Sequence, residues 1–439
     1  MKIAILGAGA TGLTAALRIA QKTSSEVTIF EKDSFLGGHA STFQINGTPI
    51  EKGYHHWFTS DNKIIDLMIE LGLESKIGWY ESSVGTIFQS KTYDFMTPID
   101  LLRYRPLSIK NRISLGLSSL KISKIKNWHD LEKFTAIEWL NKNVNSEIYK
   151  AFWEPMLIGK FGEEHYKEVG MPWLWGKMNT RFKSREGFFS KEKLGYPTGS
   201  FDIFFNALSK KCIDLGVKIQ LNSPISQIKK NESGSLSLTT NNEQTIEFDA
   251  VIATVPSNVF DKITIGLPDT YKEKLQKTRY MSAVQLILEL KNQLSKYYWL
   301  NIADRTFPFV GVIEHTNLVS QSVYGNSHVI YLSNYLTTHH PIYQLSENEL
   351  LQQYLPFLNQ INPNFSEDWI IKSHFQKISG AQPIIESKYS QKMPSHETGI
   401  ENLLLGNTSQ IYPQDRGTNY SVELGEKLAE FVIKKPINN

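Results

Sequence analysis

Three things are scarce in this chain, and each absence removes a class of protein. The single cysteine, Cys212, permits no internal disulfide, which suits a reducing compartment such as the cytoplasm. No stretch reaches the roughly 18 to 20 uncharged apolar residues that a membrane-spanning helix needs, so the chain is expected to be either soluble or attached to a membrane surface. The formal net charge of +3 over 439 residues gives no global basis for nucleic-acid binding. Any basic function must therefore be local.

What remains is a globular composition. A chain of 439 residues with 41% hydrophobic content is long enough for two packed domains, and it contains no internal repeat or low-complexity run. The first residues, MKIAILGAGATGLTAAL, share a lysine and an apolar stretch with secretory signals. Three glycines at fixed spacing within that stretch favour a different interpretation.

That interpretation is a dinucleotide site. Residues 2–6 (KIAIL) predict a buried strand, GAGATG places Gly7, Gly9 and Gly12 in the spacing G-x-G-x-x-G, and LTAALRIAQK predicts the following helix. Gly7 allows a tight turn, Gly9 lets the backbone approach a pyrophosphate, and Gly12 lets helix and strand pack closely. A second predicted strand, EVTIF, leads into Glu31, where a carboxylate can bind ribose hydroxyls. The alternative is a glycine-rich turn without a ligand.

The next segment, EKDSFLGGHASTF, carries a resemblance. Its paired glycines shortly after Glu31 resemble the FAD-dependent family that includes protoporphyrinogen oxidases, phytoene desaturases and flavin amine oxidases. In that family an Arg or Lys usually follows the glycines, whereas this chain has His39, a weaker and titratable cation. Phosphate neutralisation is then expected to depend more on backbone N–H groups. The residues of this region that the resemblance implies as cofactor contacts are Gly7, Gly9, Ala10, Thr11, Gly12, Glu31, Lys32, Gly37, Gly38, His39 and Ala40.

Two later segments extend the resemblance. Residues 195–228 predict a helix beginning near Ser200 and ending at Gly216, followed by the strand VKIQL, and Ile225 matches a family position that touches adenine through its backbone. Residues 401–433 resemble the closing motif of the family, with Gly406 and Asn407 in place of a Gly-Asp pair. The final helix is predicted to place its N-terminus under the flavin, where its dipole stabilises negative charge. It opens with Thr418, Asn419 and Tyr420.

The expected fold class is therefore α/β. A discontinuous Rossmann-like FAD-binding domain is predicted over residues 1–80, 195–256 and 395–439, and a mixed α+β substrate-binding domain over 81–194 and 257–394.

The stretch EKGYHHWFTS, residues 51–60, follows a predicted hairpin with its turn at Asn46-Gly47. It is similar to the Gly-Pro-His segment of UDP-galactopyranose mutases, which implies that Gly53, Tyr54 and His55 lie beside the flavin. His55 is the one candidate catalytic residue, with core packing as the alternative. For His56 and Trp57, packing is the preferred interpretation. No metal site is expected, because adjacent histidines on a strand point to opposite faces and no partner ligands accompany them.

Two segments of the second domain leave alternatives open. From Leu101 to His129 the chain has seven basic residues and no acid, interleaved with Ile109, Ile113, Leu117 and Leu120 at helical spacing. This pattern fits an amphipathic helix on an anionic membrane, a basic entrance for an acidic substrate, or a solvated face. Farther on, Trp153, Trp173 and Trp175 line an apolar ligand cavity or belong to the core.

The leading functional hypothesis is an FAD-dependent oxidoreductase of the oxidase or desaturase type. It would transfer hydride from a C–H bond of a largely apolar small molecule to flavin N5, with an anionic or membrane-associated substrate as one option. No second G-x-G-x-x-G occurs, so oxygen, a quinone or another diffusible acceptor is expected to reoxidise the flavin. No general base is assigned. A mutase or isomerase without net redox change and a flavin-bound scaffold are the alternatives, and the oligomeric state is left open.

Overall fold

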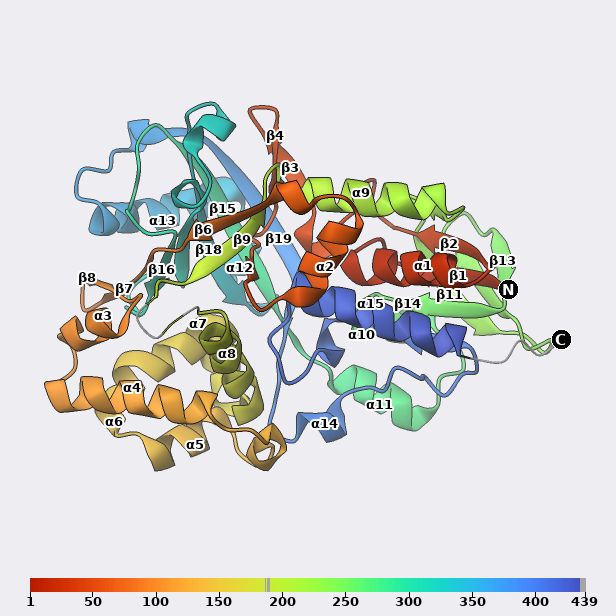
Figure 1. Ribbon diagram of the computed structural model, residues 1–439, viewed down its shortest axis with the longest axis horizontal. Helices are drawn as coiled ribbons and strands as arrows, with labels where there is room; N and C mark the ends of the chain where they lie inside the picture. The colour runs from red at the N-terminus through yellow and green to blue at the C-terminus, as the bar shows by residue number, and fades with distance from the viewer. Residues whose placement is uncertain (186, 188–189, 435–439) are drawn as a thin grey trace.

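A computed structural model describes residues 1–185, 187 and 190–434, so parts of the predicted domain segments, at 186, 188–189 and 435–439, lie outside the described residues. The molecule is elongated (Figure 1). A parallel sheet with its covering helices forms the end that carries the N-terminus. A larger sheet and a group of helices form the other end. The sheets at the two ends differ in type, one parallel and the other mostly antiparallel.

The parallel sheet has five strands in the order β10-β2-β1-β14-β20. Its strands are β1 (Lys2–Leu6), β2 (Glu26–Phe30), β10 (Lys218–Gln220), β14 (Ala250–Ala253) and β20 (Leu403–Leu405). They come from well-separated segments of the chain, as expected for a discontinuous Rossmann-like domain. Side chains alternate between faces along a strand, and here both faces are buried, which explains why β1 is apolar at every position after Lys2.

Three helices cover one face of this sheet, and a small antiparallel sheet with two helices covers the other. Ile3 and Ile5 pack toward α1 (Ala10–Lys22), α9 (Ser200–Asp214) and α15 (Thr418–Ile433). Ala4 and Leu6 pack toward a three-stranded antiparallel sheet and two further helices. Those elements are β11 (Ile225–Lys230), β12 (Leu236–Thr240), β13 (Thr245–Phe248), α10 (Ser257–Ile263) and α11 (Asp269–Lys277). The helix α1 begins at Ala10, three residues before Leu13, where the predicted helical segment starts.

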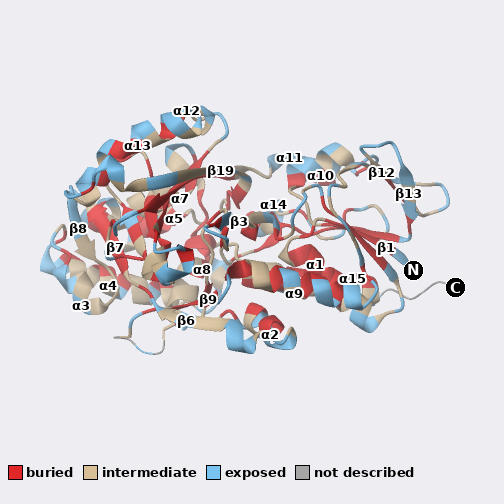
Figure 2. Ribbon diagram, turned by 90° about the horizontal axis from the view of Figure 1, so that it is seen from above, coloured by how far each residue is buried: buried red, intermediate tan, exposed pale blue. Residues whose placement is uncertain are grey.

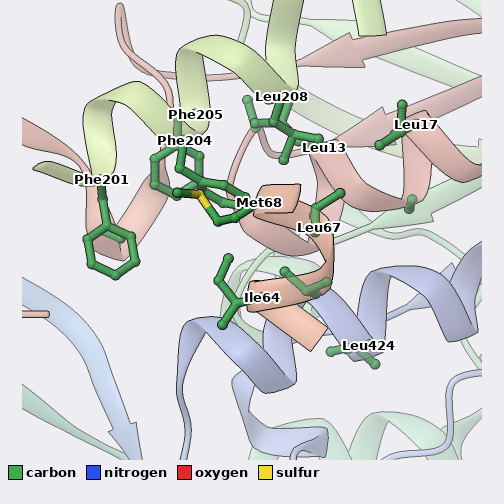
Figure 3. Packing of buried hydrophobic residues seen from close by; sticks show 14 of the residues in the cluster. Leu13, Leu17, Ile64, Leu67, Met68, Phe201, Phe204, Phe205, Leu208 and Leu424 are labelled. Atoms are coloured by element: carbon green, nitrogen blue, oxygen red, sulfur yellow. The ribbon is translucent and has the colours of Figure 1, made fainter. Parts of the chain in front are cut away.

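A short helix, α2 (Asn62–Glu70), closes the helical layer (Figure 3). Its buried side chains Ile64, Leu67 and Met68 belong to the same cluster as residues of three other helices. Figure 3 shows them among Leu13 and Leu17 of α1, Phe204 and Leu208 of α9, and Leu424 of α15. The segment that follows the two histidines is therefore anchored in the core of the nucleotide domain.

The second sheet has seven strands in the order β19-β15-β18-β17-β16-β7-β8, of which only the β16–β7 pair is parallel. Its strands are β7 (Val84–Phe88), β8 (Lys91–Asp94), β15 (Tyr280–Leu290), β16 (Trp299–Ile302), β17 (Gly311–Glu314), β18 (His328–Leu336) and β19 (Ile370–Pro383). The apolar face of α13 (Glu347–Ile361) packs on one side of it. Two short helices, α12 (Pro341–Gln344) and α14 (Tyr389–Lys392), lie in its connections.

A group of helices packs below this sheet in Figure 1. It consists of α3 (Pro98–Arg103), α4 (Ile109–Ser123), α5 (Ala136–Asn143), α6 (Ser146–Ile148), α7 (Glu154–His165) and α8 (Met171–Lys183). Trp153, Trp173 and Trp175 are all buried in its apolar cluster. Of the two interpretations left open for these tryptophans, core packing is therefore the one the structure supports.

Two small sheets join the ends of the molecule. The hairpin β3 (Thr42–Ile45) and β4 (Thr48–Glu51) turns at Asn46-Gly47, both with positive φ, as the sequence predicts. The other sheet pairs β5 (Trp57–Phe58) and β6 (Ile77–Glu81) with β9 (Lys193–Pro197). Among the described residues, no helix is long and apolar enough to cross a membrane.

Candidate cofactor site

The first glycine loop has the geometry that a tight strand-to-helix turn requires. Gly7 has φ +104°, and a Cβ there would lie 2.6 Å from Thr254 Oγ1 at the end of β14. A Cβ on Gly12 would lie 2.0 Å from the carbonyl oxygen of Gly7. Both positions are therefore closed to any side chain by protein atoms alone, because real Cβ atoms do not approach neighbours this closely.

Gly9 behaves differently. A Cβ on Gly9 would meet nothing nearer than the Cα of Gly38, at 4.0 Å, and Gly38 in turn is exposed with φ +54°. The N–H of Gly37 donates to the carbonyl of Ala8 at 3.0 Å, which ties the second glycine pair to the first loop. Two glycine surfaces thus face one another at the N-terminus of α1 with open space beside them. This cradle fits a pyrophosphate, since helix N–H groups point toward it.

Glu31 lies beside that cradle at the end of β2. Its carboxylate is 7% exposed and accepts hydrogen bonds from the N–H of Ala8 at 2.8 Å and of Asp33 at 3.0 Å. A carboxylate has about four acceptor positions, so capacity for two ribose hydroxyls remains. Glu31 consequently holds the loop in place as well as fitting the predicted ribose contact. Of the neighbouring candidates, Thr11 and Ala40 are buried, Ala10 is half-buried, and Lys32 is exposed and pairs with Asp33.

His39 stands where the family pattern has an Arg or Lys. Burial lowers the pKa of His39 to about 4, and the charge of Arg416 acts in the same direction. His39 is therefore neutral at neutral pH. That backbone N–H groups and the α1 dipole balance a pyrophosphate here stays a prediction.

The two histidines have separate surroundings. His55 Nδ1 donates to the carbonyl of Gly53 at 2.6 Å, which leaves Nε2 as the acceptor, and its ring meets Phe201 edge-on. Burial lowers the pKa of His55 to about 4 and that of His56 to about 3, so both rings are neutral at neutral pH. His56 Nδ1 is 3.0 Å from the hydroxyl of Tyr298.

Trp57 is buried, as the preferred packing interpretation requires. Tyr54, which precedes the histidines, has its hydroxyl 3.3 Å from that of Tyr335 on β18. Within the described ranges, no group of three His, Cys, Asp or Glu residues could hold a metal ion.

The closing motif differs from the family expectation at Asn407. Its side-chain amide donates to the Val255 carbonyl and the Ser257 hydroxyl, and its oxygen accepts from the N–H and hydroxyl of Ser409. All four hydrogen-bonding positions of this amide are thus used within the protein. Asn407 caps the turn after β20, and its side chain has no position left for a ribityl hydroxyl in this arrangement.

The other candidates of the middle and closing segments occupy structural positions. A Cβ on Gly406 would lie 2.2 Å from Leu428, so Gly406 lets α15 pack against β20. Asn419 Oδ1 accepts from the N–H of Ile64, and Tyr420 OH is 3.4 Å from Thr180 Oγ1. Thr418 is half-buried in the first turn of α15. Ile225 begins β11 and packs at the edge of the cluster beneath the parallel sheet.

Sequence reasoning missed a group of charged residues next to this region. Arg416 affects the pKa values of both His39 and His55 and donates through Nη2 to the hydroxyl of Tyr335 at 3.1 Å. Asp415, Lys160 and Lys177 lie beside it. The one available signal was the pair Asp415-Arg416 directly before the closing helix, because the two lysines are far away in sequence.

A dinucleotide-binding protein is the class that the parallel sheet and the glycine cradle define. Within that class, the chain belongs to the family of flavin containing amine oxidoreductases, whose model matches residues 10–413. The predicted cofactor, FAD, and the predicted class, an FAD-dependent oxidoreductase, are confirmed at the level of this family.

Curated relatives are distant. A 15-cis-phytoene desaturase of Synechococcus elongatus is 23% identical over 302 residues, which cover 62% of this chain and 60% of that protein. A coproporphyrinogen III oxidase of Staphylococcus aureus is 24% identical over 292 residues, covering 59% and 61%. The matched region thus spans about three fifths of the length of these relatives.

Solved structures match over nearly the whole chain. A putrescine oxidase bound to putrescine has a TM-score of 0.75 at 16% identity and covers 99% of this chain and 100% of its own. A reduced UDP-galactopyranose mutase has a TM-score of 0.77 at 15% identity, covering 98% and 93%. At these identities the likeness shows the fold alone, and it confirms the predicted α/β class.

Proposed function

We propose that this protein is an FAD-dependent oxidase or desaturase that removes hydride from a C–H bond of a largely apolar small molecule. The observation that carries the proposal is the open glycine cradle of Gly9 and Gly38 beside Glu31, in a chain of the flavin containing family. FAD, when bound, supplies the hydride acceptor at N5. The organic chemistry is that of the cofactor, so the protein has to bind, orient and exclude water.

Several residues of this chain suit those tasks. Ala8 and Glu31 together fix the loop at the pyrophosphate end. At the other end, His55 presents Nε2 as a neutral acceptor, because its Nδ1 proton is bound to Gly53. A neutral ring there positions a substrate group by hydrogen bonding without adding charge. This assigns His55 a positioning role and leaves proton removal without a dedicated base.

The experiment follows the substrate through a single turnover. Holoenzyme is mixed anaerobically with candidate donors, and flavin bleaching is measured together with the mass of the product. We expect two-electron bleaching with a product two hydrogens lighter, and reoxidation by oxygen or a quinone. Turnover that requires prereduced flavin and yields a product of unchanged mass would contradict this proposal in favour of the mutase alternative.

A second proposal concerns the basic segment, residues 101–129. Its apolar side chains Ile109, Ile113 and Leu117 are 68%, 49% and 63% exposed, whereas Leu115 and Ile122 of the same helix are buried. The exposed residues follow one another every fourth position and so share one face of α4. Ile99 and Leu102 of the adjacent α3 are each 49% exposed. Figure 2 shows exposed bands along both helices.

The same segment also carries exposed basic side chains. Those of the 101–129 segment that are exposed are Arg103, Arg105, Lys110, Lys121, Lys124 and Lys126. Apolar residues flanked by exposed lysine and arginine suit the interface of an anionic bilayer, where each buried Ile or Leu contributes about 1.5 to 3 kcal/mol. We propose that α3 and α4 form a peripheral membrane contact through which an apolar substrate is reached.

Cosedimentation with anionic phospholipid vesicles tests this contact. We expect wild type to bind at low salt and to bind more weakly at high salt. A triple Ile109→Ser, Ile113→Ser, Leu117→Ser variant should stay in solution, as should a charge-reversed Lys121, Lys124, Lys126 variant. Ile371→Ser, which alters a side chain 52% exposed on β19, is the matched control and should bind like wild type. If wild type does not cosediment with the vesicles, the membrane proposal is wrong and α3 and α4 form a solvent-exposed face without a lipid partner.

A further inference from the structure

Two lysines from different helices meet one carboxylate at the junction of the two ends of the molecule. Lys160 on α7 and Lys177 on α8 have their Nζ atoms 3.8 Å and 3.7 Å from Asp415 Oδ2. The three side chains are 16%, 25% and 21% exposed, so the group is largely withdrawn from solvent without being sealed. Arg416 follows Asp415 directly and adds a third cation. We call Lys160, Lys177 and Arg416 the junction cations.

Asp415 does not satisfy these cations. Its Oδ1 already accepts hydrogen bonds from Trp173 Nε1 and from the N–H of Arg416, both at 3.1 Å. Its Oδ2 is farther from each ammonium than the 2.7 to 3.2 Å of an N–H···O hydrogen bond. Across the described part of the chain, neither ammonium donates a hydrogen bond to a protein acceptor and Asp415 is the one acidic partner of both. One negative charge therefore lies beside three positive charges, and most of the donors of these cations have no protein acceptor among the described residues.

Arg416 also has a hydrogen-bond donor without a protein acceptor. Its Nη2 donates to the Tyr335 hydroxyl at 3.1 Å, but its buried Nε has no hydrogen-bond partner among the described residues. Lys160 Nζ also stands 4.4 Å from the centre of the Tyr335 ring. A buried guanidinium nitrogen without an acceptor is costly, and native proteins seldom retain one without a reason.

The ionisation of neighbouring groups reflects this excess of positive charge. Burial opposes ionisation of Tyr335, yet the charges of Lys160 and Arg416 outweigh it and lower the pKa of this phenol to about 8. Burial lowers the pKa of Lys177 to about 8, Asp415 opposes that shift, and Lys160 and Arg181 add to it. An additional anion at this place would relieve both effects.

We propose that the junction cations bind an oxyanion of the substrate, a carboxylate or a phosphate. The inference rests on the proposed function and narrows its substrate to an organic acid with an apolar body. Ammonium and guanidinium donors that converge within a poorly solvated region make strong charge-assisted hydrogen bonds to such a group. A protonated amine would be repelled at the same place. The Tyr335 hydroxyl that accepts from Arg416 at 3.1 Å lies 3.3 Å from the hydroxyl of Tyr54, the residue before His55. The bound oxyanion would therefore lie next to the predicted flavin end of the site.

Titration of the holoenzyme with potassium benzoate and with inorganic phosphate, at constant ionic strength, tests the inference. Binding is followed by calorimetry and by the difference spectrum of the flavin. We expect saturable binding of at least one probe, and the stronger probe identifies the oxyanion as carboxylate or phosphate. Lys160→Met and Lys177→Met should each weaken that binding tenfold or more. Lys183→Met, an exposed position on the same α8, should bind like wild type.

The flavin content of each variant separates this inference from the proposed function. Variants that keep a full complement of FAD but lose the anion support it. Wild type that holds FAD and binds neither probe, or Lys→Met variants that bind as wild type does, would overturn the anion site and leave the flavoenzyme proposal intact. Loss of FAD with unchanged anion binding would assign the cations to the cofactor and also overturn it. If the wild-type protein does not bind FAD, the proposed function itself is wrong.

Discussion

The nucleotide cradle and the junction cations are built on opposite principles. The cradle is made of backbone, and its key positions, Gly7 to Gly12 and Gly37 to Gly38, all lie within the first 38 residues of the chain. The junction is made of side chains that α7, α8 and the loop before α15 contribute from distant parts of the chain. The cradle is the proposed site of FAD, the cofactor that the family model implies for this chain. The junction is the proposed site of the substrate oxyanion, so it is where one substrate would be distinguished from another.

This difference decides what could be predicted from sequence. Glycine at fixed spacing has few structural explanations, so the turn, the close helix packing and the hairpin at Asn46-Gly47 were all predictable. A lysine in a helix has many explanations, and nothing local distinguishes Lys177 from the exposed Lys183 six residues later. Only the fold brings Lys177 to Asp415.

The interpretation of Asn407 shows a related limit. Sequence alone identifies an amide that can hydrogen-bond a ribityl hydroxyl, but the number of its donors and acceptors already in use depends on Val255, Ser257 and Ser409. Apolar periodicity was similarly incomplete for α4. Spacing predicted the helix, whereas only the neighbouring elements reveal that Ile113 and Leu117 face outward while Leu115 faces the core.

We expect the largest effects from substituting Gly12 and Gly9 of the cradle, and the two substitutions should differ in their consequence. Gly12→Val should prevent folding, because its Cβ would overlap the carbonyl of Gly7 at 2.0 Å. Gly9→Val should fold, since its nearest neighbour is 4.0 Å away, yet it should purify without FAD because the side chain fills the space for the pyrophosphate. Soluble yield, far-UV circular dichroism and flavin absorbance measure the two outcomes. A yellow Gly9→Val protein would show that the pyrophosphate lies elsewhere.

A smaller effect is expected for Glu31→Ala. Removing the carboxylate should raise the Kd for FAD at least tenfold, since each charge-assisted hydrogen bond to the ribose contributes about 1.5 to 3 kcal/mol. The apoprotein should also lose stability, roughly 1 to 3 kcal/mol, because the N–H groups of Ala8 and Asp33 lose their acceptor. Flavin titration of the apoprotein and urea unfolding measure the two separately. Unchanged affinity together with reduced stability would make Glu31 a loop support only.

Glu51 is a fully buried carboxyl between the two ends of the molecule. It accepts from the N–H of Phe201 at 2.8 Å and from the hydroxyl of Tyr196 at 2.9 Å. Burial raises the pKa of Glu51 to about 7. The hydrogen bonds from Phe201 and Tyr196, and one from the backbone of Glu51 itself, oppose this shift. The folded state therefore keeps the proton between about pH 4.5 and pH 7, where the unfolded chain releases it. The contribution of Glu51 to the free energy of unfolding therefore decreases as the pH rises from about 4.5 to about 7.

Glu51→Gln should remove that pH dependence. The amide oxygen can still accept from Phe201, and the amide nitrogen can donate to the Tyr196 hydroxyl. Relative to wild type, the free energy of unfolding of the variant should be higher by on the order of 3 kcal/mol at pH 8 and almost unchanged at pH 4.5. The buried histidines, whose lowered pKa values give the opposite slope below pH 6.5, are common to both proteins and cancel in the difference. Urea midpoints of both proteins at several pH values measure it. A constant difference across pH would mean that Glu51 stays ionised in the folded protein, which would require a cation or water at this position.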